Sequence, residues 1–180
     1  MTLYVGSPRG SPRDKMKLRV THIIAFVCFI LICSALLVQG APPDQLRWQG
    51  FFGGITLQDI QTRDQVSTGS SSITLVTTGD VEISADNGED ARLTENEGDS
   101  LYTEYKLEFD GDGASSTGGT TVNFTSYDSF LTSPAQVTHV LDDDQVTVTL
   151  SVRASNYANQ LANAGTYSAT QTLTAAWVDP

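Results

Sequence analysis

A histidine close to several carboxylates is the first place where this sequence could support catalysis. His139 lies just before the three aspartates at residues 142–144, and a serine nucleophile activated by such a pair would give a Ser-His-Asp hydrolase. That reaction also needs a nucleophile on a constrained turn, and the sequence has no Gly-x-Ser-x-Gly motif. Because Val137, His139 and Leu141 would share one face of a strand, we interpret His139 as structural or exposed and predict no catalytic residue.

Carboxylates elsewhere raise the question of glycoside hydrolysis or cation binding. A glycosidase holds two carboxyl groups in a cleft and raises the pKa of one of them by burial, whereas these acids fall in turns or on the wet faces of strands. Residues 110–113 (Asp-Gly-Asp-Gly) and 142–144 do supply hard oxygen ligands of the kind that calcium takes. The EF-hand pattern is incomplete, so we interpret both runs as solvated turns and predict no metal ion and no cofactor.

The N-terminal segment has the layout of a secretory signal. Five basic residues precede an apolar run at residues 23–38, and the small residues Gly40 and Ala41 follow it. A membrane span needs about 20 apolar residues, so we expect cleavage near Gly40/Ala41, with membrane contact only if the signal stays uncleaved. The predicted organisation is an N-terminal extension with the signal, residues 1–40, and one domain, residues 41–180, that is secreted or at the cell surface.

The predicted domain is strongly acidic. Residues 41–180 carry five basic and 20 acidic residues, a formal net charge of −15. Such a surface repels phosphate backbones, so we exclude nucleic acid as a partner. Both cysteines, Cys28 and Cys33, precede the domain, which therefore has no thiol for a disulfide, a nucleophile or a zinc site. Packing and strand pairing alone must hold its fold.

Apolar and polar residues alternate with a period of two through most of the domain. The alternation is clearest over residues 101–110, 146–152 and 166–178. Further strands are expected at residues 45–52, 73–77, 81–84, 120–125 and 137–141. Turn-forming runs separate them at residues 69–72, 78–80, 86–88, 110–113 and 142–144. This pattern predicts an all-β domain with the architecture of an Ig-like antiparallel β-sandwich.

The segment that follows the predicted cleavage site alternates in the same way. Leu46, Trp48, Gly50 and Phe52 fall on one face of an extended chain. Two interpretations remain open. The segment is either the first strand of its own sandwich, or a strand that is offered to the open sheet edge of a neighbouring molecule.

The C-terminal stretch carries a resemblance to a known class of proteins. Residues 164–174 read Ala-Gly-Thr-Tyr-Ser-Ala-Thr-Gln-Thr-Leu-Thr. This Ala-Gly-x-Tyr turn with alternating threonines resembles the closing strand of chaperone–usher pilins of the disulfide-free colonisation-factor type, and of the spore coat protein U domain. The end of the chain, residues 175–180, is also similar to the WxL cell-surface domain, although the WxL motif itself is absent.

The resemblance implies a role for the first strand. In pilins, an N-terminal extension of alternating apolar residues completes the sandwich of the next subunit, and Leu46, Trp48, Gly50 and Phe52 would be the donated residues here. The implied function is a fimbrial, pilin-like or adhesive surface subunit that is not an enzyme. Its partners would be copies of itself or related subunits, together with a periplasmic chaperone.

The alternative function is a monomeric secreted module that binds carbohydrate or protein. Such a module would use exposed aromatic side chains, for which the candidates are Tyr102, Tyr127 and Tyr157. On either reading we expect Tyr167, Leu173 and Trp177 in the core of the last strand and outside any binding site.

Overall fold

The computed structural model of the chain describes residues 44–178, except residues 96 and 159–160. The predicted signal and its cleavage site lie outside these residues. Strands dominate the described chain, which also has one short 3₁₀ turn, η1, at Glu89–Ala91. The strands are β1 Leu46–Gln49, β2 Val66–Thr77, β3 Val81–Ala85, β4 Tyr102–Phe109, β5 Gly118–Gly119, β6 Val122–Ser126, β7 Ala135–Thr138, β8 Gln145–Ser155 and β9 Leu173–Trp177.

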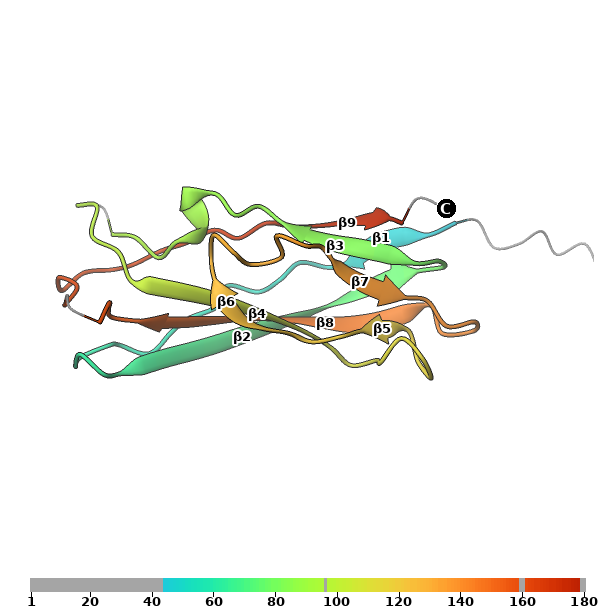
Figure 1. The fold of residues 1–180 in the computed structure, drawn as a ribbon, viewed down its shortest axis with the longest axis horizontal. Helices are drawn as coiled ribbons and strands as arrows, with labels where there is room; N and C mark the ends of the chain where they lie inside the picture. Colours follow the sequence, from blue (N-terminus) through green and yellow to red (C-terminus); the bar gives the residue numbers. More distant parts are fainter. Residues whose placement is uncertain (1–43, 96, 159–160, 179–180) are drawn as a thin grey trace, which may run out of the picture. The chain divides into compact units, whose positions relative to one another are not determined.

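The strands form two antiparallel sheets that pack against each other (Figure 1). One sheet has the order β1-β2-β8-β4-β6, and the other has the order β5-β7-β3-β9. The chain changes sheet repeatedly, so that β2 and β3 belong to different sheets although only a short turn separates them. The predicted antiparallel β-sandwich is therefore confirmed.

The alternating residues of β8 and of its two neighbours, β2 and β4, form the centre of the core. β8 pairs along most of its length with both β2 and β4, so that Leu150 lies opposite Ser71 on one side and Leu107 on the other. Leu107 is fully buried, as period-two alternation requires for a sheet with one covered face. Other fully buried side chains come from β2, β3, β7 and β8 and from the loop before β7: Leu75, Val81, Ile83, Phe130, Val137, Val146 and Val148.

β2 is longer than the sequence predicts. Residues 69–72, a glycine and three serines, were expected to form a turn, but they lie inside β2, where Gly69 pairs with Val152 and Ser72 pairs with Thr149. The Ser72 and Thr149 hydroxyl groups also hydrogen-bond each other at 2.8 Å. The prediction failed because pairing with the long, apolar β8 outweighs the weak local preference of serine and glycine for strands.

The last predicted strand is shorter than expected. Of residues 166–178, only Leu173–Trp177 form a strand, and β9 lies at the edge of its sheet. Leu173 packs against the core, but Tyr167 is only half-buried and Trp177 is 39% exposed. The prediction that Tyr167 and Trp177 lie in the core is therefore wrong, because the chain before β9 runs as a loop and the ring of Trp177 lies over Gly79 instead.

Candidate functional site

β1 is a short strand at the edge of the larger sheet. It pairs antiparallel with the end of β2, from Leu46 opposite Thr77 to Gln49 opposite Thr74. Leu46 and Trp48 are half-buried and contact the core, whereas Arg47 and Gln49 are exposed. The other long side of β1 pairs with no strand in the described part of the chain. β1 therefore has a free main-chain edge, which is a template for further strand pairing.

The structure brings three of the four predicted donor-strand residues together. Leu46, Trp48 and Phe52 all pack against the core, and the Trp48 and Phe52 rings lie 6.0 Å apart between centroids. Gly50 lies beyond the end of β1 and has a φ of +104°, a conformation that glycine adopts at little cost. The predicted strand over residues 45–52 thus ends early, because the chain bends at Gly50.

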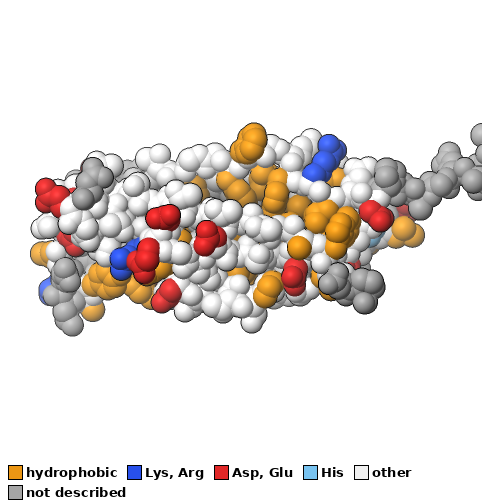
Figure 2. Space-filling view, turned by 90° about the horizontal axis from the view of Figure 1, so that it is seen from above, with side chains coloured by type: hydrophobic (Ala, Val, Ile, Leu, Met, Phe, Trp, Pro, Cys, Tyr) orange, Lys and Arg blue, Asp and Glu red, His pale blue; other side chains and the backbone are white. Residues whose placement is uncertain are grey.

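An apolar groove opens beside β1. It encloses about 490 Å³ and lies between the edges of the two sheets, with walls from Trp48, Gly50, Phe51, Phe52, Ile73 and Leu173. Phe51 is 95% exposed, and the sequence analysis did not single it out. The signal for it was an aromatic residue where the alternation predicts a polar one. Figure 2 shows hydrophobic side chains gathered on the face of the sandwich seen from above, where β9 and β1 lie in Figure 1.

The sheet edges on the opposite side of the sandwich are blunted. The register between β4 and β6 shifts between Tyr105 and Leu107, which marks a β-bulge at the β6 edge. The other edge there, β5, consists of two glycines only. Bulges and very short strands are devices that prevent edge-to-edge pairing. β1 and β9 are longer than β5 and carry the aromatic side chains Trp48 and Trp177, so the edges on this side of the sandwich are the less protected ones.

His139 ties loops together at one end of the sandwich. It follows β7 and does not lie in it. Its Nε2 is 2.9 Å from Asp144 Oδ1, and its main-chain N–H donates to Asp80 Oδ1 at 2.8 Å. Leu141 is 82% exposed, so the predicted strand face shared by Val137, His139 and Leu141 does not form. Among the described residues, no serine or threonine hydroxyl group hydrogen-bonds to the His139 ring.

Aspartates of the two acidic runs accept hydrogen bonds from main-chain N–H groups. Asp110 accepts a hydrogen bond from the Thr147 N–H at 2.7 Å, and Asp143 accepts one from the Thr117 N–H at 2.7 Å. Asp112 accepts the N–H groups of Ser115 and Ala114, which lower the pKa of its carboxyl group to about 2 because they favour the ionised form. In the described part of the chain, no group of three or more His, Cys, Asp and Glu side chains gathers as a metal site would require.

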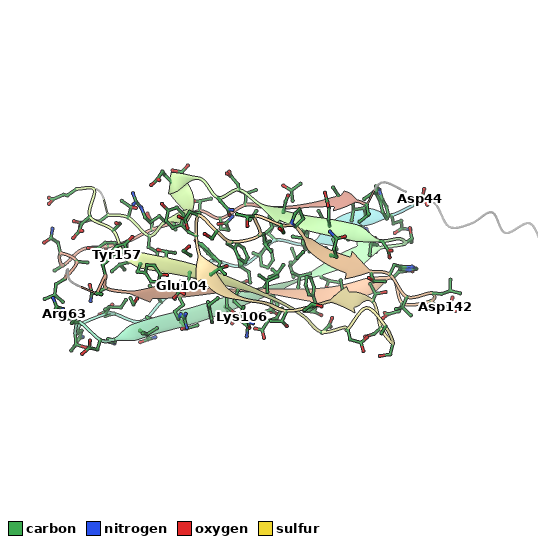
Figure 3. All side chains as sticks on the ribbon, in the orientation of Figure 1. Asp44, Arg63, Glu104, Lys106, Asp142 and Tyr157 are labelled. Carbon is green, nitrogen blue, oxygen red and sulfur yellow. The ribbon has the colours of Figure 1, made fainter. Side chains whose placement is uncertain are left out.

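The three candidate tyrosines do not form one surface. Tyr102 and Tyr157 meet edge to face, with ring centroids 5.7 Å apart, and are 38% and 36% exposed. Tyr127 lies elsewhere, with the Arg92 guanidinium 5.7 Å from its ring centroid. A second feature on the outer face of β4 and β8, the ion pair of Glu104 with Arg153 at 2.8 Å, was not predicted from the sequence. Figure 3 labels Glu104 and Lys106 on β4, and Tyr157 just beyond the end of β8.

Arg153 also stacks on an aromatic ring of the same sheet. Its guanidinium lies 4.3 Å from the centroid of the Phe124 ring, and the Lys106 ammonium lies 6.0 Å from that centroid. Both are cation–π contacts. Two of the few basic side chains of the domain are therefore engaged within this face, whereas Arg47 on β1 makes no ion pair among the described residues.

Two further observations bear on the site. In the part of the chain that the structure describes, no helix is long and apolar enough to cross a membrane. Comparisons of the chain with protein-family models, with curated proteins and with solved structures found no match.

The geometry alone defines the candidate site. It is the side of the sandwich between β1 and β9, with its free strand edges and apolar groove.

Proposed function

We propose that this protein is an exported structural or adhesive surface subunit that joins copies of itself or related subunits by strand addition. One observation supports the proposal above the others. β1 is an edge strand of four residues, and its apolar side chains lie half-buried beside an open apolar groove. Strand addition uses the free main-chain groups for affinity and the alternating side chains for specificity.

The partial burial of its apolar side chains is a reason for this segment to leave its own sheet for a neighbouring one. Full burial of a Leu or Phe side chain stabilises by about 1.5–3 kcal/mol. In the single chain, the segment of residues 46–52 buries Leu46, Trp48 and Phe52 only in part. A neighbouring sandwich that encloses these three side chains fully therefore gains more free energy than the single chain does.

Deletion of residues 41–53 tests the proposal. We expect the purified truncated protein to remain unassembled in size-exclusion chromatography and electron microscopy, whereas the intact protein forms oligomers. A synthetic peptide of residues 41–53 should restore the circular dichroism spectrum of the truncated protein without restoring assembly. The same peptide carrying Trp48→Asp is the matched control and should fail to do so.

Two results would contradict strand addition. If the truncated protein has the oligomeric state of the intact protein, β1 plays no part in assembly. If truncation unfolds the domain and the peptide has no effect, β1 is an ordinary strand of its own sandwich.

The contact of Tyr102 with Tyr157 favours a second candidate function, a monomeric module that binds carbohydrate or protein. Two exposed rings in edge-to-face contact give a rigid apolar surface, beside the polar Glu104–Arg153 pair. Tyr102→Ala and Tyr157→Ala should each weaken binding to a glycan array or a captured protein ligand about tenfold or more. Tyr127→Ala is the matched control. A stable monomer in which all three variants behave alike would exclude this function as well.

A further inference from the structure

The chain between β1 and β2 returns along β2 without forming a strand (Figure 1). We call residues 50–61 the strap. Gly53 approaches Ser71, since a Cβ placed on Gly53 would lie 3.5 Å from the Ser71 hydroxyl oxygen. Farther along, Ile55 and Leu57 pack over Gly69. The strap therefore runs antiparallel to the first half of β2, as β1 runs antiparallel to the second half.

The surface beneath the strap consists of small side chains. Ser67, Gly69 and Ser71 alternate with the outward-facing residues of β2, and they continue the inner face on which Ile73 and Leu75 form core. We call these three residues the shelf. A Cβ on Gly69 would lie 2.6 Å from Cγ2 of Ile55 and 3.1 Å from Cδ2 of Leu57. The shelf is therefore a recess that receives large apolar side chains, and Gly69 leaves the room for them.

The strap covers the shelf with few specific contacts. Ladder pairing of β2 with the N-terminal segment stops at Thr74, so Val66–Ile73 of β2 pair with β8 alone in the described part of the chain. The hydrogen bonds near the strap cluster at its far end, as when the Gln61 N–H donates to Gln65 Oε1 at 2.8 Å. Ser67 Oγ is buried and has no hydrogen-bond partner among the described residues. A buried hydroxyl group without a partner is unfavourable, so the strap is an imperfect cover.

The charges indicate what could replace the strap. β2 has no charged residue from Val66 to Thr77, although the domain around it is strongly acidic. Segment 45–57 has Arg47 as its only charged residue. A neutral shelf on an acidic domain thus suits a strand that is apolar on one face and carries a single positive charge on the other. Residues 46–52 of this chain are such a strand.

We propose that the shelf is the acceptor site for residues 46–52 of a second copy, which displace the strap from β2. The inference rests on the proposed function and specifies where the donated strand binds. The eight residues of β2 without a ladder partner on this side, Val66–Ile73, are enough to pair with this segment of seven residues. Its large apolar side chains take the places of Ile55 and Leu57, and its main chain pairs with the open edge of β2.

The test is the binding of a fluorescent peptide of residues 44–53 to the purified intact protein, followed by anisotropy. The double variant Ile55→Ser/Leu57→Ser weakens the hold of the strap, and we expect the peptide to bind it about tenfold more tightly than the parent. Gly69→Val fills the shelf, and we expect binding to fall about tenfold or more. Thr121→Val is the matched control, because Thr121 is exposed between β5 and β6, at the edge of the sandwich away from the strap, and it should bind as the parent does.

The outcomes separate this inference from the proposed function. If the peptide binds the double variant and Gly69→Val as it binds the parent, the acceptor site is elsewhere, while loss of assembly on deletion of residues 41–53 would still support strand addition. If that deletion leaves assembly unchanged, strand addition itself fails. Circular dichroism establishes that each variant is folded. Should Gly69→Val not fold, the double variant decides alone, and unchanged or weaker binding by it overturns the proposal.

Discussion

The two side chains of this domain that could be taken for reactive groups, His139 and Tyr105, hold loops in place. His139 joins two turns through Asp80 and Asp144, and Tyr105 holds η1. The Tyr105 ring packs on Phe130 with centroids 5.5 Å apart, and its hydroxyl group donates to the Ala91 carbonyl oxygen at 2.7 Å. These two side chains thus fix chain connections between strands, which β-sheet pairing alone leaves free.

Tyr105→Phe should lower the free energy of unfolding at pH 7 by about 1–3 kcal/mol, because the buried Ala91 carbonyl loses its donor. Burial also raises the pKa of Tyr105 from 10.0 to about 12. The raised pKa favours the folded state fully below pH 10 and progressively less as the pH rises toward about 12. Urea unfolding of the variant should therefore depend less on pH in that window than unfolding of the parent. Tyr157→Phe is the exposed control, and an equal effect there would contradict the assignment.

At the scale of elements, whether a strand could be predicted from the sequence depended on which strands lie beside it in the sheet. β4 and β8 were predicted from alternation, because both are central strands with one covered face. The Gly69–Ser72 run was missed because its strand depends on β8, and Trp177 was misplaced because edge position does not appear in a period-two pattern. The alternation indicated Leu46, Trp48 and Phe52, whereas the groove walls from Ile73 and Leu173 depend on how two distant edges meet.

The loop between β4 and β5 depends on the ionised form of Asp112. Hydrogen bonds from Ser115 and Ala114 lower its pKa from 3.8 to about 2. Their contribution is present above pH 3.8 and is lost as the pH falls toward about 2. Asp112→Asn should therefore reduce the change in the urea unfolding midpoint between those two pH values. Asp142→Asn, in an exposed turn, is the control, and a parent-like acid profile for Asp112→Asn would show that these bonds do not stabilise the loop.

At the scale of the whole molecule, net charge opposes self-association. Each domain carries −15, while the strand edges and groove proposed to join the copies are apolar or neutral except for Arg47. Repulsion between like-charged copies acts at long range and is screened by salt, with a Debye length of about 10 Å at 0.1 M. Contacts between apolar strands act at short range and are little affected by that screening.

Assembly should therefore increase when salt is raised from about 0.01 M to about 0.5 M. Static light scattering of the purified protein at constant concentration measures this. The variant Arg47→Gln controls for the one positive charge on β1, and it should assemble less than the parent at low salt and equally at high salt. Dissociation on addition of salt would mean that attraction between charges holds the copies together, contrary to the proposal.

The two ends of the domain are fastened to the same turn. The Thr78 N–H donates to the Gln45 carbonyl oxygen at 3.1 Å, and the Val178 N–H donates to the Asp80 carbonyl oxygen at 3.1 Å. A force that pulls the two ends apart would therefore act first on the hydrogen bonds of β1 and β9 nearest that turn. The remaining hydrogen bonds of each strand would then break one after another. A subunit that carries mechanical load is consequently better held by contacts along the length of its strands. A force applied at its own ends breaks the hydrogen bonds one at a time, which is the arrangement that resists force least.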